Sequence, residues 1–382
     1  MEDAGEGLTF DPERQVLARR RQMEALTFGL LGFGLFLFLA FLTLPTGLSL
    51  RLEGWALSLT QNPWAVVGLY VLVGYLVLAV LALPLRLVGR QSEVRSRMSR
   101  QSWPSWALDR LKATLLGLAF ALVAVEALYW TIRNLGELWW LGFWFLSLAF
   151  SLLAGFLGPV LLLPLFYRVE ETRDVRMRER LQALSARAGV RALGVYEFRS
   201  SAKTERGTAA VTGLGRTRRI LLSDHILKAY TPREVEGILS HELAHHAHRD
   251  PARFLLLSAV LSLVVLLLLD RLVRGTMTAY GIASLAQVAN LPLFVLFGGI
   301  FYAITGPLSR SFSRWREALA DRRGAELVGD PEALARALVK LHDQNLGVAD
   351  PHPWVERLFY THPSGRRRVR WLRSQAEGPS RG

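Results

Sequence analysis

Six apolar runs, each of about 20 residues or longer, constrain this chain more than any other feature of its sequence. A helix of about 20 residues spans the hydrocarbon core of a bilayer, because each residue adds about 1.5 Å. Hydrophobic residues make up 51% of the 382 residues, which is high for a soluble domain. We therefore predict a mainly α-helical, polytopic membrane protein with about six spans. The runs lie near residues 24–44, 64–88, 109–132, 138–166, 253–274 and 284–307.

Arginine marks one side of this membrane region. Arginine is frequent before the first run, between the second and third runs, after the fourth run and after the sixth run. Six spans place all four segments on one side, and the positive-inside rule predicts that this side is the cytoplasm. The net charge of +14 follows this pattern, so we expect the lipid bilayer as a partner and no nucleic acid.

The amino-acid composition limits which catalytic mechanisms are possible and indicates the kind of organism that the chain comes from. No cysteine is present, which excludes disulfides and thiol catalysis. Nearly all positive charge is arginine, which is typical of a GC-rich bacterial genome, so we expect a multi-pass protein of the bacterial inner membrane. The first apolar run is long enough to span the membrane, so we do not expect a cleaved signal peptide.

The segment His241-Glu242-Leu243-Ala244-His245 carries the strongest chemical signal. Residues four apart share one face of a helix, so His241 and His245 can present two imidazoles to one metal ion. Glu242 can then act as general base on a water molecule beside that metal, as in zinc metalloproteases. The segment Thr231-Pro232-Arg233-Glu234 predicts the start of this helix, because it combines a capping box with proline at the first position.

Glu317 is the best candidate for a third ligand, because a catalytic zinc takes three protein ligands and keeps one open position. Asp321 lies one turn further along the same predicted helix and can accept a hydrogen bond from a zinc-binding histidine. His246 and His248 also lie near the motif. Two histidines and a glutamate already fill the ligand set, so we expect these two to pack at an interface.

Two further sets of residues, His362 with Arg368 and Glu126 alone, allow two interpretations each. His362 and Arg368 could direct positive charge at the oxyanion of a tetrahedral intermediate, or Arg368 could belong to a solvated basic run. Glu126 lies inside the third apolar run, where it could line a water-filled chamber or make a hydrogen bond between packed helices.

Alternating residues predict a small β-sheet before the motif. Residues 195–198 form one predicted strand, and residues 209–212 and 219–222 form a predicted hairpin around a turn that contains Gly213 and Gly215. The strand at 209–211 could be an exposed edge that pairs with an extended peptide, or an ordinary edge of the sheet.

In combination, these motifs resemble the integral-membrane zinc metalloproteases of the type I CAAX prenyl protease family, in a bacterial form. The matching blocks keep the family's order and comprise residues 241–245, residues 316–321, Thr361-His362-Pro363 with Arg368, and the hairpin at 211–220. The resemblance implies a gluzincin-type site with one zinc ion per chain. Its residues would be His241, His245 and Glu317 as ligands, Glu242 as base, Asp321 behind a ligand, and His362 and Arg368 near the substrate.

The chain departs from the family at three points. Thr208-Ala209-Ala210 stands where the family commonly has Asn-Ala-Tyr, so the role of that asparagine is not carried over. Eukaryotic members usually have seven spans. The segment His248-Arg249-Asp250 is more similar to the HtpX-type heat-shock proteases.

These expectations define a domain organisation and a function. We predict a zinc-dependent endopeptidase that cleaves peptide or protein substrates at the cytoplasmic membrane face, with CAAX-type processing of lipidated C-termini as one form of this activity. One alternative is an HtpX-type quality-control protease of misfolded membrane proteins, and another is a metal-binding scaffold without proteolytic activity. The predicted parts are a cytoplasmic segment (1–23), four spans (24–167), a first protease part (168–252), two spans (253–308) and a second protease part (309–382).

Overall fold

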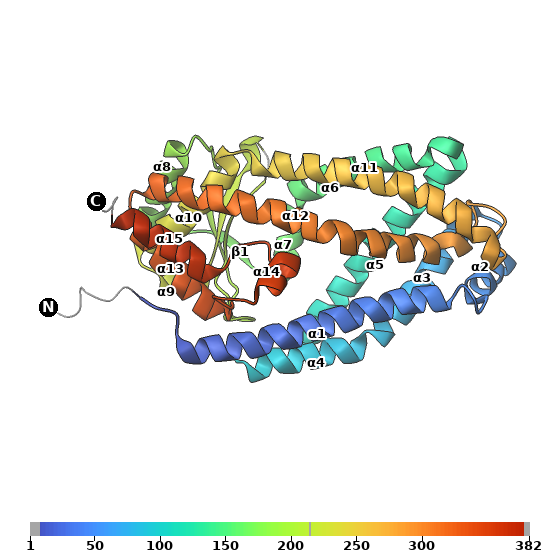
Figure 1. The fold of residues 1–382 in the computed structure, drawn as a ribbon, viewed down its shortest axis with the longest axis horizontal. Helices are drawn as coiled ribbons and strands as arrows, with labels where there is room; N and C mark the ends of the chain where they lie inside the picture. Colours follow the sequence, from blue (N-terminus) through green and yellow to red (C-terminus); the bar gives the residue numbers. More distant parts are fainter. Residues whose placement is uncertain (1–7, 214, 378–382) are drawn as a thin grey trace.

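The computed structural model describes residues 8–213 and 215–377. The molecule is elongated, with long helices along its length and with a small sheet and shorter helices gathered at one end (Figure 1). We call this the sheet end, and the end that carries the short helix α2 (Leu48–Leu59) the opposite end. The long helices are α1 (Pro12–Leu42), α3 (Pro63–Leu81), α5 (Trp103–Leu135), α6 (Trp139–Leu157), α11 (Asp250–Thr276) and α12 (Leu291–Val328).

Five helical segments are long and apolar enough to cross a membrane, rather than the predicted six. The difference arises because the third and fourth predicted spans form one segment of 64 residues, Trp103–Phe166. Within this segment, Gly136 adopts a φ of +53° and separates α5 from α6. Trp139, at the start of α6, donates to Asp270 near the end of α11 over 2.6 Å, so α6 and α11 run in opposite directions.

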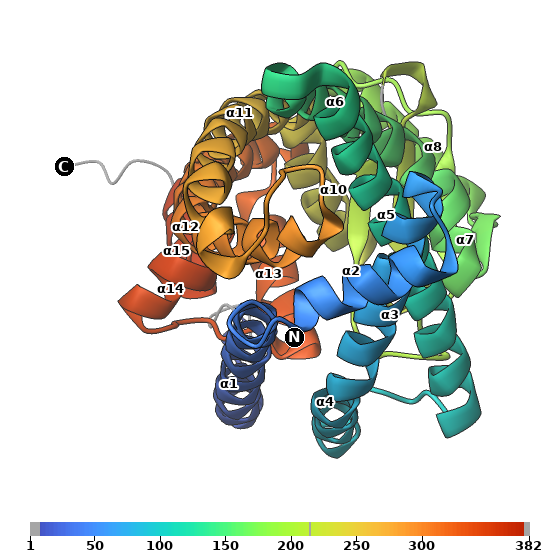
Figure 2. The same ribbon diagram turned by 90° about the vertical axis from the view of Figure 1, so that its right-hand side faces the viewer.

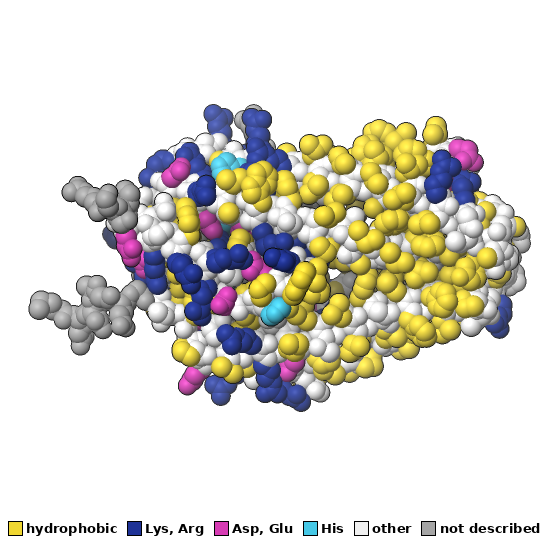
Figure 3. Space-filling view, viewed as in Figure 1, with side chains coloured by type: hydrophobic (Ala, Val, Ile, Leu, Met, Phe, Trp, Pro, Cys, Tyr) yellow, Lys and Arg dark blue, Asp and Glu magenta, His cyan; other side chains and the backbone are white. Residues whose placement is uncertain are grey.

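The surface of the long helices is apolar, and basic side chains concentrate at the sheet end (Figure 3). Exposed leucine, valine and phenylalanine side chains, such as Leu30, Phe145 and Val264, face outward from these helices, as lipid contact requires. The basic segments that the sequence places on one side of the membrane therefore lie at the same end as the sheet.

Three predicted boundaries fall inside helices. Helix α1 continues through residues 23 and 24, α11 through residues 252 and 253, and α12 through residues 308 and 309 with Pro307 inside it. Hydropathy shows where an apolar run ends, but the helix continues because its polar part packs against other helices. In contrast, the motif helix α10 (Pro232–Ala247) is separate from α11, since Arg249 adopts a φ of +56° between them.

The sheet has the strand order β1-β2-β4-β3. The predicted strand β2 (Val195–Phe198) and the predicted antiparallel pair β3 (Ala209–Thr212) and β4 (Arg219–Ser223) are present, whereas β1 (Val169–Glu171) was not predicted. Strand β3 lies at one edge of the sheet among the described residues. Buried side chains of α8 (Val175–Arg187), α10 and β4 pack together and fix the motif helix against the sheet; they include Leu181, Leu184, Leu239, Leu243, Ile220 and Leu222.

Glu126 lies on α5 beside α3, where a Cβ built on Gly68 would be 3.8 Å from its Oε1 atom. Its Oε2 atom is buried and has no hydrogen-bond partner among the described residues. This placement gives no support to the helix-packing hydrogen bond, so a chamber-lining role stays a prediction.

A half-buried histidine is expected to make the sheet end sensitive to acid. Burial lowers the pKa of His342, on α13 (Pro331–Asn345), to about 4, although its Nδ1 atom is 2.9 Å from the Leu338 carbonyl. An unfolded histidine has a pKa of about 6.5, so the unfolded chain gains a proton that the folded chain rejects as the pH falls from about 6.5 to 4. The free energy of unfolding should therefore decrease by about 3 kcal/mol over this window.

We expect His342→Leu to remove most of this acid sensitivity, because the substituted side chain cannot be protonated. Thermal unfolding of the detergent-solubilised protein at pH 7 and pH 4.5 measures the effect, with the exposed His352→Asn as control. An equal loss of stability in His342→Leu and in the unchanged chain would contradict this assignment.

Candidate metal centre

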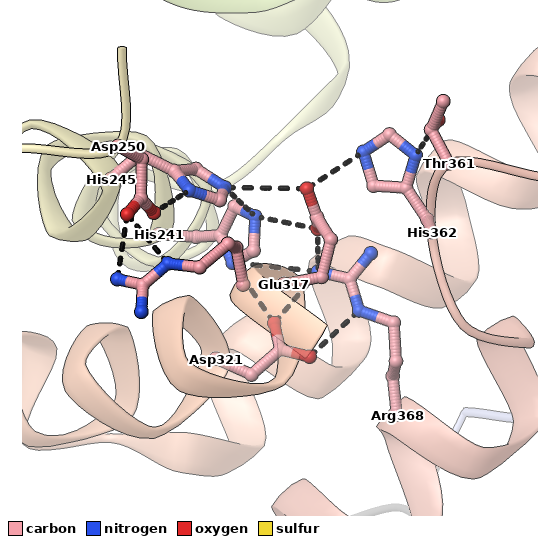
Figure 4. A network of polar contacts seen from close by, with 9 residues as sticks. His241, His245, Asp250, Glu317, Asp321, Thr361, His362 and Arg368 are labelled. Atoms are coloured by element: carbon pink, nitrogen blue, oxygen red, sulfur yellow. Dashed lines mark hydrogen bonds and ion pairs between the residues drawn. The ribbon is translucent and has the colours of Figure 1, made fainter. Parts of the chain in front are cut away.

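The helix that carries the H-E-x-x-H motif begins as the sequence predicts. The Thr231 hydroxyl accepts a hydrogen bond from the Glu234 backbone N–H, and the Glu234 carboxylate accepts one from the Thr231 backbone N–H. Pro232 occupies the first helical position. Starting from this cap, His241 and His245 lie one turn apart on the same face, and their Nε2 atoms are 3.3 Å from each other (Figure 4).

Glu317 of α12 approaches both histidines. Its Oε2 atom is 3.2 Å from His241 Nε2, and its Oε1 atom is 3.3 Å from His245 Nε2. A tetrahedral ion with bonds of about 2.0–2.1 Å separates its ligand atoms by about 3.3 Å. The spacing and chemistry of these three side chains therefore fit a zinc ion, and the structure brings the predicted ligand set together.

A carboxylate lies next to the Nδ1 atom of each histidine, which is the outer ring nitrogen and faces away from Glu317. Asp321 Oδ1 is 2.9 Å from His241 Nδ1, as predicted, and Asp250 Oδ2 is 2.8 Å from His245 Nδ1. These contacts leave both Nε2 atoms directed inward toward Glu317 (Figure 4).

Asp250 was not singled out from the sequence. It comes five residues after His245, and only the turn at Arg249 brings its side chain back to the motif. The buried Arg316 side chain donates to its other oxygen over 2.6 Å. An acidic residue directly before a proline, just ahead of the predicted span near 253–274, was the available signal.

The carboxylates give the centre a strong preference for positive charge. Burial alone would lower the pKa of His241, but its contacts with Asp321 and Glu317 outweigh this effect and raise the pKa to about 10. The same field that stabilises an imidazolium also stabilises a metal cation between neutral imidazoles.

The placement of Arg368 rules out one of the two interpretations of the sequence. It lies on α15 (Gly365–Ala376), is buried, and donates two hydrogen bonds to Asp321 over 2.7 and 2.8 Å. This pairing buries the guanidinium, so the side chain does not belong to a solvated basic run. Its Nη2 atom also lies 3.7 Å from Glu317 Oε2, and a role of Arg368 near a substrate oxyanion stays a prediction. The contact with Asp321 holds that carboxylate against His241.

His362 lies on the open side of the centre. Its Nε2 atom is 3.3 Å from Glu317 Oε1, and its Nδ1 atom is 2.8 Å from the Thr361 hydroxyl (Figure 4). The side chain is 55% exposed, whereas that of Glu317 is 7% exposed. His362 can therefore meet a bound molecule at the entrance of the site.

Glu242 is half-buried beside the two histidines, and its carboxylate forms no hydrogen bond or ion pair within the described part of the chain. Burial raises the pKa of this carboxylate, and the nearby His241 and His245 partly oppose the effect. A carboxylate with a raised pKa is a stronger base, which suits proton transfer near neutral pH.

His246 faces away from the other histidines. Its Nε2 atom is 2.9 Å from the Val211 carbonyl of the edge strand β3. This contact agrees with the expected interfacial role and fixes the sheet edge beside the motif helix.

A close helix contact sets the position of Glu317. A Cβ built on Gly324 of α12 would lie 3.0 Å from the Cα and N atoms of His241, and backbone atoms cannot move aside. We expect Gly324→Val to push α12 away from α10 and to weaken zinc binding at least about tenfold, as changes around metal ligands do. Competition with a chromogenic chelator measures the affinity.

Gly298→Val is the matched control for this prediction. Gly298 lies on the same helix, and nothing lies within 4 Å of its Cβ position. Equal zinc affinities of the two variants would show that the contact between Gly324 and His241 does not position the ligand.

The match to known protein families decides what kind of site this is. Residues 171–376 match the family described as Peptidase family M48, and this range covers more than half of the chain. The chain belongs to peptidase family M48. Residues 9–168 match the description "CAAX prenyl protease N-terminal, five membrane helices". That description has one helix more than the four spans predicted for this region.

Relatives of this M48 protein support the same assignment. The uncharacterized metalloprotease YhfN of Bacillus subtilis (strain 168) is 30% identical over 347 residues, which are 90% of this chain and 81% of YhfN. A protease HtpX homolog of Burkholderia multivorans is 30% identical over 187 residues, covering 40% of this chain and 58% of that protein. The crystal structure of Ste24p from S. mikatae shares the fold, with a TM-score of 0.81, 19% identity and coverage of 95% and 89% of the two chains.

The M48 chain is therefore a membrane metalloprotease, and the resemblance inferred from its motifs is confirmed. Membership of this family favours a hydrolase over the alternative of a scaffold without proteolytic activity.

Proposed function

We propose that this M48 protein is a zinc-dependent endopeptidase that cleaves peptide or protein substrates at the cytoplasmic face of a bacterial inner membrane. The observation that carries the proposal is the convergence of His241, His245 and Glu317 beside the unpaired carboxylate of Glu242. The arginine-rich surface at the sheet end supports the cytoplasmic orientation (Figure 3).

The chain's own residues perform the proton transfers of this reaction. When bound, zinc supplies a Lewis acid that polarises the peptide carbonyl and favours ionisation of water. Glu242 accepts the proton of the attacking water and then delivers it to the leaving amide nitrogen. His362, at the entrance, donates a hydrogen bond to the oxyanion of the tetrahedral intermediate.

Residues behind the ligands keep this arrangement in place. Asp321 and Asp250 each fix the orientation of one histidine ring, and Arg368 and Arg316 in turn hold these two carboxylates. Such outer contacts determine which ring nitrogen is available to the metal.

The edge strand β3 is the surface to which we expect an extended substrate to bind. An extended peptide can add to a free sheet edge through main-chain hydrogen bonds, without a requirement for particular side chains. The contact between His246 and the Val211 carbonyl fixes this edge against the motif helix. The small side chains of Ala209 and Ala210 support a broad range of substrate residues. This arrangement favours unfolded segments of membrane proteins as substrates.

CAAX-type processing is the second candidate. The match of residues 9–168 to the N-terminal region of CAAX prenyl proteases motivates it. It requires a lipidated C-terminus, whereas the first candidate requires only an unfolded segment.

Both candidates can be compared in proteoliposomes that contain the full chain. We expect cleavage of an unfolded membrane-protein substrate without any lipid modification, loss of cleavage with a chelator, and recovery after zinc is added. Cleavage restricted to prenylated peptides would favour CAAX-type processing. Failure to cleave every substrate with one zinc bound per chain would overturn the proposed function.

A further inference from the structure

A basic pocket of about 360 Å³ lies at the sheet end of the membrane region, away from the metal centre. Helix α4 (Leu83–Arg95) continues from α3 and lies beside α1 (Figures 1 and 2). Residues of α1, α4 and the first turns of α5 line the pocket, together with Arg206 from the loop before β3. The arginines that line it are Arg21, Arg86, Arg90, Arg110 and Arg206, and the acidic residues are Glu24 and Glu93.

The acidic side chains leave most of this positive charge unpaired. Glu93 forms ion pairs with Arg21 and Arg206 over 3.2 and 3.3 Å. None of the ion pairs found within residues 8–213 and 215–377 involves Arg86, Arg90 or Arg110. Three guanidinium groups therefore line the same pocket without a carboxylate partner.

Arg90 is the most informative member of this group, because it is only 4% exposed. Its Nη2 atom donates to the Gln101 carbonyl over 2.8 Å, but its Nε and Nη1 atoms have no hydrogen-bond partner. A buried arginine rarely leaves donors unused, since each unpaired donor costs free energy. The Nε atom of Arg110 is also buried without a partner.

Two tryptophans hold Arg90 in a way that keeps these donors available. The guanidinium carbon of Arg90 lies 4.2 Å from the ring centre of Trp103 and 5.3 Å from that of Trp106. Stacking uses the flat face of a guanidinium, whereas its N–H groups point outward in the plane. Arg90 is thus held ready to donate to an anion with several acceptor oxygens, such as a phosphate group.

The location of the pocket indicates where such a phosphate comes from. Trp103 is 55% exposed at the start of α5, and Ala25 and Phe28 line the pocket where the apolar part of α1 begins. Tryptophan and arginine at the end of membrane helices mark the headgroup level of the bilayer. A phosphate at this depth, with apolar side chains beside it, belongs to a lipid.

From these observations, we propose that the pocket between α1, α4 and α5 binds the phosphate group of an anionic phospholipid through Arg86, Arg90 and Arg110. The bound headgroup would contact all three helices, of which α1 and α4 are already joined by the ion pair between Arg21 and Glu93. It also lies beside Arg206, three residues before the edge strand β3.

The proposal is tested on the full zinc-loaded chain in detergent, titrated with phosphatidylglycerol, phosphatidylcholine or inorganic phosphate. Thermal unfolding and native mass spectrometry report stabilisation and the number of lipids retained. We expect phosphatidylglycerol to bind at least about tenfold more tightly than phosphatidylcholine, because three unpaired arginines favour a net negative headgroup. Equal responses to the two lipids would overturn the proposal. Stabilisation by inorganic phosphate alone, with no preference for lipid, would overturn the lipid assignment.

Substitutions locate the effect at this pocket. Arg86→Gln and Arg110→Gln should each weaken phosphatidylglycerol binding at least about fivefold, and they leave the buried Arg90 in place for folding. Arg271→Gln is the control, because Arg271 is an exposed arginine on α11, at the opposite end of the membrane region. Unchanged lipid affinity in both pocket variants, with normal zinc content and thermal stability, would refute the site.

Discussion

Replacing Glu242 by glutamine is expected to abolish peptide cleavage while the fold and the bound metal remain. The amide has nearly the same shape as the carboxylate but cannot accept a proton from the attacking water. Loss of a positioned general base lowers the rate by about 10²–10⁴-fold. Because Glu242 is not among the three side chains that converge as ligands, the zinc content should stay at one per chain. The turnover number in proteoliposomes and the zinc stoichiometry of the same preparation measure the two effects.

A matched control separates this effect from a general loss of charge. Glu179→Gln makes the same change at an exposed position of α8 and should leave the turnover number unchanged. If Glu242→Gln kept more than about a tenth of the activity, Glu242 would not be the base, because such a loss is smaller than base removal produces.

Replacing Glu317 by alanine is expected to remove the metal itself. Glu317 is the proposed ligand that connects α12 to the two histidines, with oxygens 3.2 and 3.3 Å from their Nε2 atoms. The affinity for zinc should fall by more than about 100-fold, beyond the 10–100-fold loss typical of residues behind the ligands. Asp321→Asn and Asp250→Asn provide that comparison, because among the three candidate ligands each of these carboxylates contacts one histidine, through its Nδ1 atom. Chelator competition on purified protein ranks the three variants.

Removal of zinc from the unchanged chain provides an internal check on this ranking. Ligand binding to the folded state raises the melting temperature, so a chelator should lower it in the unchanged chain. In Glu317→Ala the chelator should have no further effect, because no metal remains to be removed. A Glu317→Ala variant that kept zinc as tightly as Asp321→Asn would show that Glu317 is not a ligand.

The ligand set could be predicted from the sequence because it depends on local helix geometry. His241 and His245 are one turn apart, as are Glu317 and Asp321, so each pair shares a helix face before any tertiary contact is known. The capping box at Thr231 likewise depends only on neighbouring residues and is present as predicted.

The features that the sequence did not reveal depend on packing between distant elements. The contact of Asp250 with His245 requires the left-handed conformation of Arg249, which is unusual for arginine. The orientation of Arg368 depends on how α15 packs on α12 and α13, because Val369 and Leu372 are buried in that interface. Hydropathy could locate the apolar runs, but it could not show that α12 continues for 38 residues into the metal centre.

The continuity of α12 makes the active site mechanically dependent on the bilayer. The same helix contacts α1 inside the membrane region, where Gly299 lies against Leu37, and carries Glu317 eighteen residues later. At about 1.5 Å per residue, the part of α12 between Gly299 and Glu317 is about 27 Å long. A tilt of this helix by about 3° would therefore move the Glu317 carboxylate by more than 1 Å. Helices adjust their tilt to the thickness of the surrounding lipid. Membrane thickness should therefore act on the affinity of this protease for zinc, and a catalytic fragment cut free of its spans would lose the support of Glu317, the proposed third ligand.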